Sequence, residues 1–358
     1  MTMSGKRRFV REDVLRIKEP SYRSLPDKTI KMNDNSNLFS INPIVRKIRE
    51  QFDFESLSAY PSVSSDMLRN AVAGKNGVDP SQVIVGNGSD EIIDLVVKAF
   101  VDPGDAAVIL SPSFEMYSRY LAVAGARIIE STLDAENFGI DVESIISSRA
   151  KIKFICSPNN PTGNAFSLTD IRRIAEESDS IVVVDEAYIE FALDQESAVG
   201  LVDELDNVIV LRTLSKAYGL AGLRIGYAVG GREPVGFVRR ICAPFRLNRL
   251  SEWVATKAIE SDDFVKKVAE MAKEERDWTS SALSSLGAVV YPSVTNFLLF
   301  KPPVPSAVLV ASLMDMGIAI RDCGEKPLLD GCARVTLGPR KLNERFIDAV
   351  RTVTEDAS

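Results

Sequence analysis

One lysine stands among small and apolar residues in TLSKAYGLAGLRIGY, which runs from Thr213 to Tyr227. Burial disfavours the charged form of a lysine, so Lys216 in such surroundings would have a lowered pKa. The neutral amine is a nucleophile that forms a Schiff base with a carbonyl group. The alternative is an ordinary surface lysine in a loop. Arg224, eight positions later, is a second cation in the same stretch.

A carboxylate follows a strongly apolar run in SIVVVDEAY, residues 180–188. A charge at the end of a buried strand is costly unless it is paired. Asp185 therefore needs a cation, a set of hydrogen-bond donors or a protonated heterocycle as its partner. An N-cap or an ion pair with a neighbouring loop would meet the same need without any catalytic role.

Two further loops have the residue types of ligand-binding turns. GNGSDE (Gly86–Glu91) has glycines that let the backbone approach a ligand, and the helix expected after it offers free N–H groups to an anion such as phosphate. SPNNPTG (Ser157–Gly163) has two prolines and a glycine that would fix a rigid turn and hold Asn160 in one direction. Each loop taken alone is more often a structural turn than a site.

The four polar segments lie at the ends of predicted strands. Short β-branched runs alternate with helical stretches such as 114–124, which is typical of an α/β fold with a largely parallel sheet. Because ligands of such sheets bind beyond the carboxyl ends of the strands, we expect the four segments to share one site. The predicted strands are QVIV (82–85), AAVIL (106–110), ARIIE (126–130), KIKFIC (151–156), SIVVVDEAY (180–188), NVIVLRTLSK (207–216) and RIGYAVG (224–230).

The character of the chain changes after Arg249. A long amphipathic stretch, SEWVATKAIESDDFVKKVAEMAKEERDWTSSALSSLG, predicts one or two long helices. Short strands are then predicted in AVVYP, TNFLLFKP, GIAIRD and ARVTLG, and a last helix in KLNERFIDAVRTVTE. We therefore expect an N-terminal arm (1–39) packed on a second domain, a large domain (40–249), and a connecting helix with a smaller α+β domain (250–358).

Composition excludes several classes of function. The chain of 358 residues has no histidine, which removes a Ser-His-Asp triad and every His-ligated metal site. Its formal net charge of −7 argues against binding to bulk nucleic acid. Its four cysteines form no CxxC pair, and neither a signal peptide nor a membrane span is predicted. We expect a cytoplasmic protein.

One ligand would satisfy the four segments together. It needs a phosphate for the glycine loop and Arg224, and an aldehyde for Lys216. It also needs a basic ring nitrogen for Asp185 and a phenolate-type oxygen for Asn160 and Tyr188. Pyridoxal 5′-phosphate (PLP) carries all of these groups, and the joint match is far more specific than any single loop.

The same segments resemble the fold-type I pyridoxal-phosphate aminotransferases, and within them the histidinol-phosphate aminotransferase group. The resemblance implies an aspartate-aminotransferase-like fold, with a mostly parallel seven-stranded sheet in a large PLP-binding domain. The run from DEAY through LRIGY is highly specific. In order along the chain, the matching blocks are AYPSVSSDMLRNAVA, GNGSDEII, PSFEMY, PNNPTG, VDEAYIEF, RTLSKAYGLAGLRIGY, TNFLLF, GIAIRD and RVTLG.

The resemblance implies a role for each cofactor residue. Lys216 would be the Schiff-base lysine, Asp185 would pair with the ring nitrogen, and Tyr188 is the third implied catalytic residue. Phe114 would stack on the ring, a core aromatic being the alternative. Tyr60 matches a tyrosine that reaches the neighbouring subunit's cofactor phosphate, which implies a homodimer with shared active sites. The implied cofactor-binding residues are Tyr60, Gly88, Ser89, Asp90, Phe114, Asn160, Asp185, Tyr188, Ser215, Lys216 and Arg224.

Four residues are implied at the substrate end. Arg334 matches the arginine that binds the acidic group of the substrate. Arg321 matches an arginine used for the substrate phosphate in histidinol-phosphate enzymes, with a solvated edge charge as the alternative. Tyr22 and Asn37 are the other two expected substrate residues.

Two segments depart from the family pattern, both toward the substrate. NSNLFSINP (Asn35–Pro43) lacks the acidic residue, the first proline and the glycine of the family's block. PFRLN (Pro244–Asn248) has Arg246 where the family has a small amide. This arginine could favour a dianionic substrate or point to solvent.

The resemblance implies a ping-pong transamination in which Lys216 also moves the proton. The expected substrates are L-histidinol phosphate and 2-oxoglutarate, and the expected products are imidazole acetol phosphate and L-glutamate. Three alternatives stay open: an aromatic amino-acid aminotransferase, a threonine-phosphate decarboxylase-like PLP enzyme, and a PLP-binding regulator. The lack of a basic DNA-binding extension argues against the last.

Overall fold

The computed structural model describes residues 9–11, 14–15, 17, 19 and 25–356. Tyr22, an expected substrate residue, therefore lies outside the described residues. Among the described residues, no helix has both the length and the apolar composition needed to cross a lipid bilayer.

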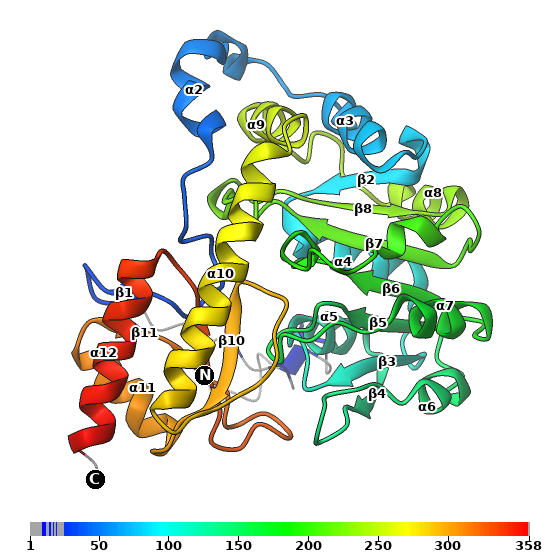
Figure 1. Ribbon diagram of the computed structural model, residues 1–358. Helices are drawn as coiled ribbons and strands as arrows, with labels where there is room; N and C mark the ends of the chain where they lie inside the picture. The colour runs from blue at the N-terminus through cyan, green and yellow to red at the C-terminus, as the bar shows by residue number, and fades with distance from the viewer. Residues whose placement is uncertain (1–8, 12–13, 16, 18, 20–24, 357–358) are drawn as a thin grey trace.

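A seven-stranded sheet forms the centre of the larger part of the molecule (Figure 1). Its strand order is β2-β8-β7-β6-β5-β3-β4, and every neighbouring pair is parallel except the two pairs made by β8. The predicted α/β class and mostly parallel seven-stranded sheet are confirmed. The strands are β2 (Val83–Gly86), β3 (Ala106–Ser111), β4 (Arg127–Thr132), β5 (Ile152–Cys156), β6 (Ile181–Asp185), β7 (Val208–Thr213) and β8 (Gly226–Gly230).

Helices cover both faces of this sheet. In β6, Val182 and Val184 belong to one apolar core, and Val183 belongs to the core on the other face. Burial on both faces explains why the strands are continuous apolar runs and do not alternate with polar residues. One core includes residues of α3 (Asp66–Asn76), α6 (Val142–Ser147), α7 (Leu168–Glu176) and α9 (Arg249–Ile259), and the other includes residues of α4 (Gly88–Phe100), α5 (Met116–Ala124) and α8 (Arg232–Arg240).

A four-stranded antiparallel sheet lies in the C-terminal part, in the order β12-β13-β10-β9. The long helix α10 runs beside α12 (Figure 1). The elements are α10 (Asp263–Ser285), β9 (Val289–Val290), β10 (Phe297–Lys301), α11 (Ser306–Asp315), β11 (Ile318–Ala319), β12 (Arg321–Asp322), β13 (Ala333–Thr336) and α12 (Arg340–Asp356).

The N-terminal segment contacts both parts of the chain. β1 (Ile30–Lys31) pairs in parallel with β11, while α2 (Pro43–Gln51) packs on α9. Helix α9 in turn packs on α3 of the larger part, although the sequence groups residues 250–259 with the connecting helix. The three-part domain division stays a prediction. Short 3-10 helices complete the chain: η2 (Glu55–Ser58), η3 (Pro80–Gln82), η4 (Ile189–Phe191), η5 (Ala198–Leu201) and η6 (Ala221–Leu223).

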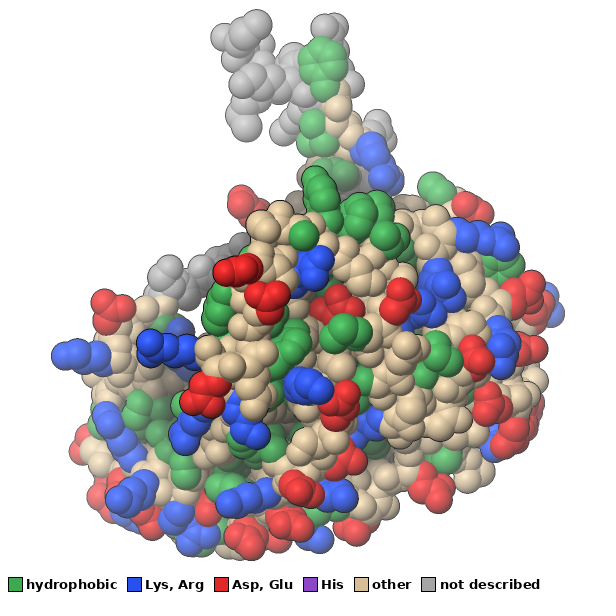
Figure 2. Space-filling view, turned by 90° about the horizontal axis from the view of Figure 1, so that it is seen from above, with side chains coloured by type: hydrophobic (Ala, Val, Ile, Leu, Met, Phe, Trp, Pro, Cys, Tyr) green, Lys and Arg blue, Asp and Glu red, His purple; other side chains and the backbone are tan. Residues whose placement is uncertain are grey.

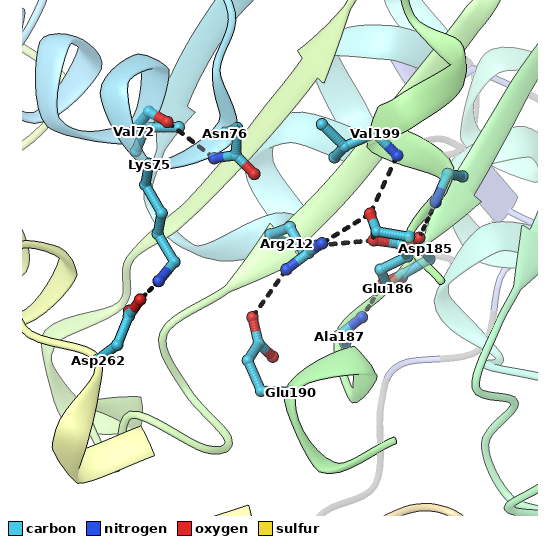
Figure 3. Close-up of polar contacts among 12 residues, drawn as sticks. Val72, Lys75, Asn76, Asp185, Glu186, Ala187, Glu190, Val199, Arg212 and Asp262 are labelled. Atoms are coloured by element: carbon cyan, nitrogen blue, oxygen red, sulfur yellow. Dashed lines mark hydrogen bonds and ion pairs between the residues drawn. The ribbon is translucent and has the colours of Figure 1, made fainter. Parts of the chain in front are cut away.

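A buried ion cluster joins the C-terminal end of β7 to the residues that follow β6 (Figure 3). The Arg212 guanidinium donates to Glu186 (2.7 Å), Glu190 (3.1 Å) and the Ser197 hydroxyl (2.8 Å). Glu186 also accepts from the backbone N–H of Ala198 (2.6 Å). Because Glu186 directly follows Asp185, this cluster holds the turn that carries the predicted catalytic carboxylate.

Replacing Arg212 with methionine should destabilise the protein strongly. The change leaves two carboxylates buried without their cation, and removing one partner of a buried ion pair costs about 3–5 kcal/mol. Urea unfolding followed by circular dichroism measures the loss. Arg172→Met is the matched control, because the ion pairs of Arg172 with Glu176 and Glu204 are solvent-exposed; its loss should stay below about 1 kcal/mol. Equal losses in the two variants would contradict the assignment.

Candidate active site

A cavity of about 420 Å³ lies at the carboxyl ends of the central parallel strands. Cys156, Asp185 and Thr213, the last residues of β5, β6 and β7, line it side by side. The C-terminal part and the N-terminal segment 33–36 complete the wall. The predicted residues that line this cavity are Ser89, Asp90, Phe114, Asn160, Asp185, Tyr188, Ser215, Lys216, Arg224, Arg321 and Arg334.

Lys216 lies in the loop that follows β7. Its amine donates to the backbone carbonyl of Asp34 (2.9 Å) and lies 5.7 Å from the centre of the Tyr188 ring. Burial, with the positive charge of Arg334 as the next cause, lowers the pKa of Lys216 to about 8. The amine therefore loses its proton far more readily than that of an exposed lysine, which is what a nucleophile or general base requires.

Asp185 is buried at the end of β6. One carboxylate oxygen accepts from the Tyr117 hydroxyl (2.7 Å), and the other accepts from the backbone N–H of Ala187 (3.1 Å; Figure 3). Both donors are neutral, and burial raises the pKa of Asp185 to about 6. A cation placed against this carboxylate would stabilise its charged form.

Tyr188, Asn160 and Arg334 form a polar wall opposite Asp185. The Tyr188 hydroxyl accepts from the side-chain amide of Asn35 (3.0 Å). Arg334 donates to the Asn160 side-chain oxygen and to the backbone carbonyl of Asn33 (2.8 Å). Burial lowers the pKa of Arg334, and its Nε has no hydrogen-bond partner among the described residues. The wall thus presents a desolvated guanidinium with unused donor capacity, which suits an anionic ligand.

A second anion-binding feature is built where β8 meets the start of α4. Arg224 pairs with Asp90 (3.2 Å), and Gly88 has φ +79° directly beside that guanidinium. A Cβ on Gly88 would lie 2.7 Å from Arg224 Nη2, and a Cβ on Gly226 would lie 2.3 Å from the Ser89 backbone nitrogen. Glycine at 226 lets β8 approach the backbone of the helix start so closely, and glycine at 88 is favoured by its positive φ.

The groups gathered there are those that bind a phosphate. The first N–H groups of the thirteen-residue helix α4 are free of intrahelical partners and carry the positive end of its dipole. The side chains of Ser89 and Arg224 line the same corner, and so does Ser215, whose hydroxyl lies 3.0 Å from that of Thr213. Gly88 does not line the cavity but starts helix α4 directly before Ser89; its role at a phosphate stays a prediction.

The substrate end of the cavity is positively charged. Arg321 and Lys326 line it with Arg334, and Glu115 is the acid that approaches them, at 3.8 Å from Arg321 and 3.6 Å from Lys326. Three cations face the carboxylates of Glu115 and Asp34, so this end keeps a net positive charge that suits an anionic substrate.

Besides Gly88, three predicted or discussed residues do not line the cavity. The Tyr60 side chain is 79% exposed, and its ring lies 5.0 Å from that of Phe245. Asn37 does not line the cavity but donates to the backbone carbonyl of Ala217 (3.0 Å), so it supports the lysine loop from outside. Arg246 lines a different cavity.

Several cavity residues were missed by the sequence interpretation. Asn33, Asp34 and Asn35 belong to an irregular segment without any periodic pattern, and only tertiary packing brings them to the lysine and the arginine. Lys326 had no motif. Tyr117 does not line the cavity but donates to Asp185, and it had a signal, because it is three residues after Phe114 in a predicted helix and the two rings pack at 5.5 Å.

The fold and the cavity define an enzyme that combines a lysine amine of lowered pKa with a helix start whose N–H groups are free to bind an anion. Residues 27–350 match the family model described as aminotransferase class I and II. The chain belongs to this family, which confirms the predicted resemblance and the predicted enzyme class, a PLP-dependent aminotransferase.

Individual relatives agree with this placement. The chain is 36% identical over 348 residues to a histidinol-phosphate aminotransferase of Thermoanaerobacter sp. (strain X514), covering 96% of this chain and 98% of that protein. A solved histidinol-phosphate aminotransferase from Sinorhizobium meliloti in complex with pyridoxal-5′-phosphate has a TM-score of 0.85 and 25% identity, covering 92% of each chain. An L-threonine-O-3-phosphate decarboxylase from Porphyromonas gingivalis, at 24% identity and a TM-score of 0.79, shares the fold alone, covering 91% of this chain and 99% of that one.

Asp185→Asn should change the stability of the cofactor-free protein in a pH-dependent way. Burial raises the folded-state pKa of Asp185 to about 6, above the roughly 3.9 of an unfolded aspartate. The contribution of the protonated side chain to stability is complete below about pH 4 and is lost as the pH rises through about 6. Asparagine avoids this loss, so the variant should gain roughly 2–3 kcal/mol relative to the wild type between about pH 4 and pH 7.

Urea unfolding of the cofactor-free wild type and variant at the two pH values measures this difference. Adding PLP should then stabilise the wild type more than the variant, because a ring cation opposite Asp185 removes the cost of its charge. A stability difference that is the same at both pH values would show that Asp185 is not the titrating group.

Proposed function

We propose that this protein transfers the amino group of L-histidinol phosphate to 2-oxoglutarate, giving imidazole acetol phosphate and L-glutamate. One observation carries the proposal. A single cavity joins a lysine amine of lowered pKa to an end lined by Arg321, Lys326 and Arg334. The names of the relatives that match over nearly the whole chain support histidinol phosphate as the amino donor.

The residues present fit PLP as the cofactor. When bound, PLP supplies a ring that accepts electron density from the reacting carbon of the substrate. Asp185, whose hydrogen-bond donors are both neutral, would hold a protonated ring nitrogen. Tyr188 and Asn160 would bind the ring oxygen. The start of α4, with Ser89, Ser215 and Arg224, would bind the phosphate, and Phe114 would pack on the ring face.

Lys216 is proposed to move the proton. Its pKa of about 8 keeps a useful fraction of the amine neutral near physiological pH, where a general base works best. The carbonyl of Asp34 and the Tyr188 ring orient the amine within the cavity. Asn37 supports the same loop through Ala217, so we propose a positioning role for it rather than direct substrate contact.

The cations at the substrate end are proposed to bind both amino donor and amino acceptor. Arg321 and Lys326 would meet the phosphate of histidinol phosphate, and Arg334 would hold an acidic group nearer the lysine. The carboxylates of 2-oxoglutarate present similar charges to the same groups. One site can therefore serve both halves of a ping-pong reaction.

The alternative functions are less well supported. An aromatic amino-acid aminotransferase needs an apolar pocket, whereas Arg321, Lys326 and Glu115 make this end polar. A threonine-phosphate decarboxylase shares the fold, but it releases CO2, whereas a transaminase forms a new amino acid from a keto acid. The relatives described above carry enzyme names, which does not favour a PLP-binding regulator.

A homodimer with shared active sites is part of the proposal. Tyr60 is outside the cavity of its own chain and 79% exposed, so it is available to a second copy. The end of the molecule that carries α2 and α3 has hydrophobic side chains exposed among charged ones (Figure 2). The exposed apolar residues of segment 41–67, which includes Tyr60, are Ile41, Val45, Phe54, Leu57, Val63 and Met67. The cytoplasmic location stays a prediction.

The products of the reaction test the proposed function. PLP-loaded protein is supplied with histidinol phosphate and 2-oxoglutarate, and glutamate is measured; threonine phosphate is supplied separately, and CO2 is measured. Glutamate formation that depends on histidinol phosphate supports the proposal. CO2 release from threonine phosphate without a keto acid would replace it with the decarboxylase.

Arg321→Gln should weaken the phosphate-bearing donor selectively. Loss of one charged hydrogen-bond partner is expected to raise the KM for histidinol phosphate by roughly 10–100-fold, and the KM for phenylalanine by much less. Steady-state kinetics with both donors measures the two changes. Equal increases for both donors would remove Arg321 from phosphate recognition.

Mixing two inactive variants should restore activity if the active sites are shared. Tyr60→Ala and Lys216→Ala each lose one component, and a hybrid dimer regains one intact site. Unfolding and refolding an equimolar mixture should therefore recover about a quarter of the wild-type activity, assuming random pairing in a two-fold dimer. Recovery of no activity, in a mixture shown to be dimeric by light scattering, would contradict the shared site.

A further inference from the structure

A second cavity, of about 500 Å³, lies apart from the active site and shares no lining residue with it. It is formed by α3, β2, α8 and the loop that follows α8. Four arginines line it, and no aspartate or glutamate does; the arginines are Arg69, Arg239, Arg240 and Arg246. In a chain of net charge −7, such a concentration of positive charge in one concavity requires an explanation.

Arg69 is the fixed member of this arginine cluster. Its side chain is buried and donates to the backbone carbonyls of Val83 (3.2 Å) and Pro80, and it pairs with Asp66 at 3.3 Å. Burial and then the charge of Arg239 lower the pKa of Arg69. The like charges are thus close enough to destabilise one another.

The other arginines have little to neutralise them. Within the described residues, Arg69 is the one arginine of this cluster that forms an ion pair with a carboxylate, that of Asp66. Nη1 of Arg246 is buried without a hydrogen-bond partner among the described residues. A buried donor without a partner carries a desolvation cost that an anionic ligand would remove.

We propose that this cavity is a second anion-binding site, which takes a phosphate group either as free phosphate or as a small organic phosphate. Guanidinium groups bind phosphate oxygens in pairs, and Arg239 and Arg246 are available for such contacts. Val63 contributes an exposed aliphatic side chain to the lining, which suits the carbon part of an ester. The volume is in the range of small-ligand sites.

The second cavity is separate from the active-site cavity, but a hydrogen bond links the residues beside the two cavities. The side-chain amide of Asn87, just before the phosphate-binding start of α4, donates to the backbone carbonyl of Arg246 (2.9 Å). Arg246 is also the residue that departs from the family's small amide. The function proposed for the first cavity does not use this arginine, whereas an anion site does.

Phosphate binding to the PLP-loaded protein tests the inference, because the cofactor then occupies the phosphate corner of the active site. Calorimetric titration at low ionic strength compares inorganic phosphate with glycerol 3-phosphate. Arg246→Gln and Arg239→Gln should each raise the Kd by roughly tenfold or more. Tighter binding of inorganic phosphate would identify free phosphate as the ligand, and tighter binding of glycerol 3-phosphate would identify an organic phosphate.

Two matched variants locate the binding. Arg232→Gln removes an exposed arginine from the same helix and should not change the Kd of the second site. Arg321→Gln removes a cation from the active-site cavity, so it should weaken only the phosphate binding proposed there and leave the Kd of the second site unchanged. Loss of binding in Arg321→Gln, with Arg246→Gln and Arg239→Gln unaffected, would overturn the inference, as would no binding by the wild type. Light scattering supplies a further test. Conversion of Arg246→Gln from dimer to monomer without a change in phosphate affinity would assign the arginines to a subunit contact.

Discussion

Two ionisable groups of opposite charge, the buried Asp185 and the half-buried Lys216, line one cavity without forming an ion pair, and both are desolvated. Burial raises the pKa of Asp185 to about 6 and lowers that of Lys216 to about 8, so each side chain is destabilised in its charged form. A ligand that brings a ring cation to the carboxylate and a carbonyl to the amine relieves both costs. The catalytic chemistry of the site and its demand for a cofactor therefore have the same physical origin.

The rest of the structure maintains this arrangement. Parallel strands place the last residues of β5, β6 and β7 at one edge, and Arg212 holds the β6 turn from behind through Glu186 and Glu190. The N-terminal segment closes the cavity by accepting hydrogen bonds from Lys216 and Arg334 through backbone carbonyls. Residues far apart in the chain thus desolvate Asp185 and Lys216 together, and both side chains would be ionised in water.

The sequence predicted those features that depend on local pattern. Apolar runs ending in DEAY, SPNNPTG and LSK placed Asp185, Asn160 and Lys216 at strand ends, and the parallel topology then required them to meet. The segment 33–36 could not be found this way, because its side chains reach the cavity through contacts with residues some 150 to 300 positions away. The hydrogen bond from Tyr117 to Asp185 and the pairing of Arg212 with Glu186 depend on packing between elements, which no local pattern encodes.

The central claim is that Lys216 and Asp185 serve a transamination of histidinol phosphate. The most direct test is a half-reaction on PLP-loaded protein, followed by the visible absorbance of the lysine-bound cofactor. Histidinol phosphate, phenylalanine, tyrosine and threonine phosphate are added separately, without a keto acid. The account predicts rapid loss of the visible band with histidinol phosphate at low concentration, and no such band in Lys216→Ala. A wild-type protein without the band, or a Lys216→Ala variant with full activity, would contradict it.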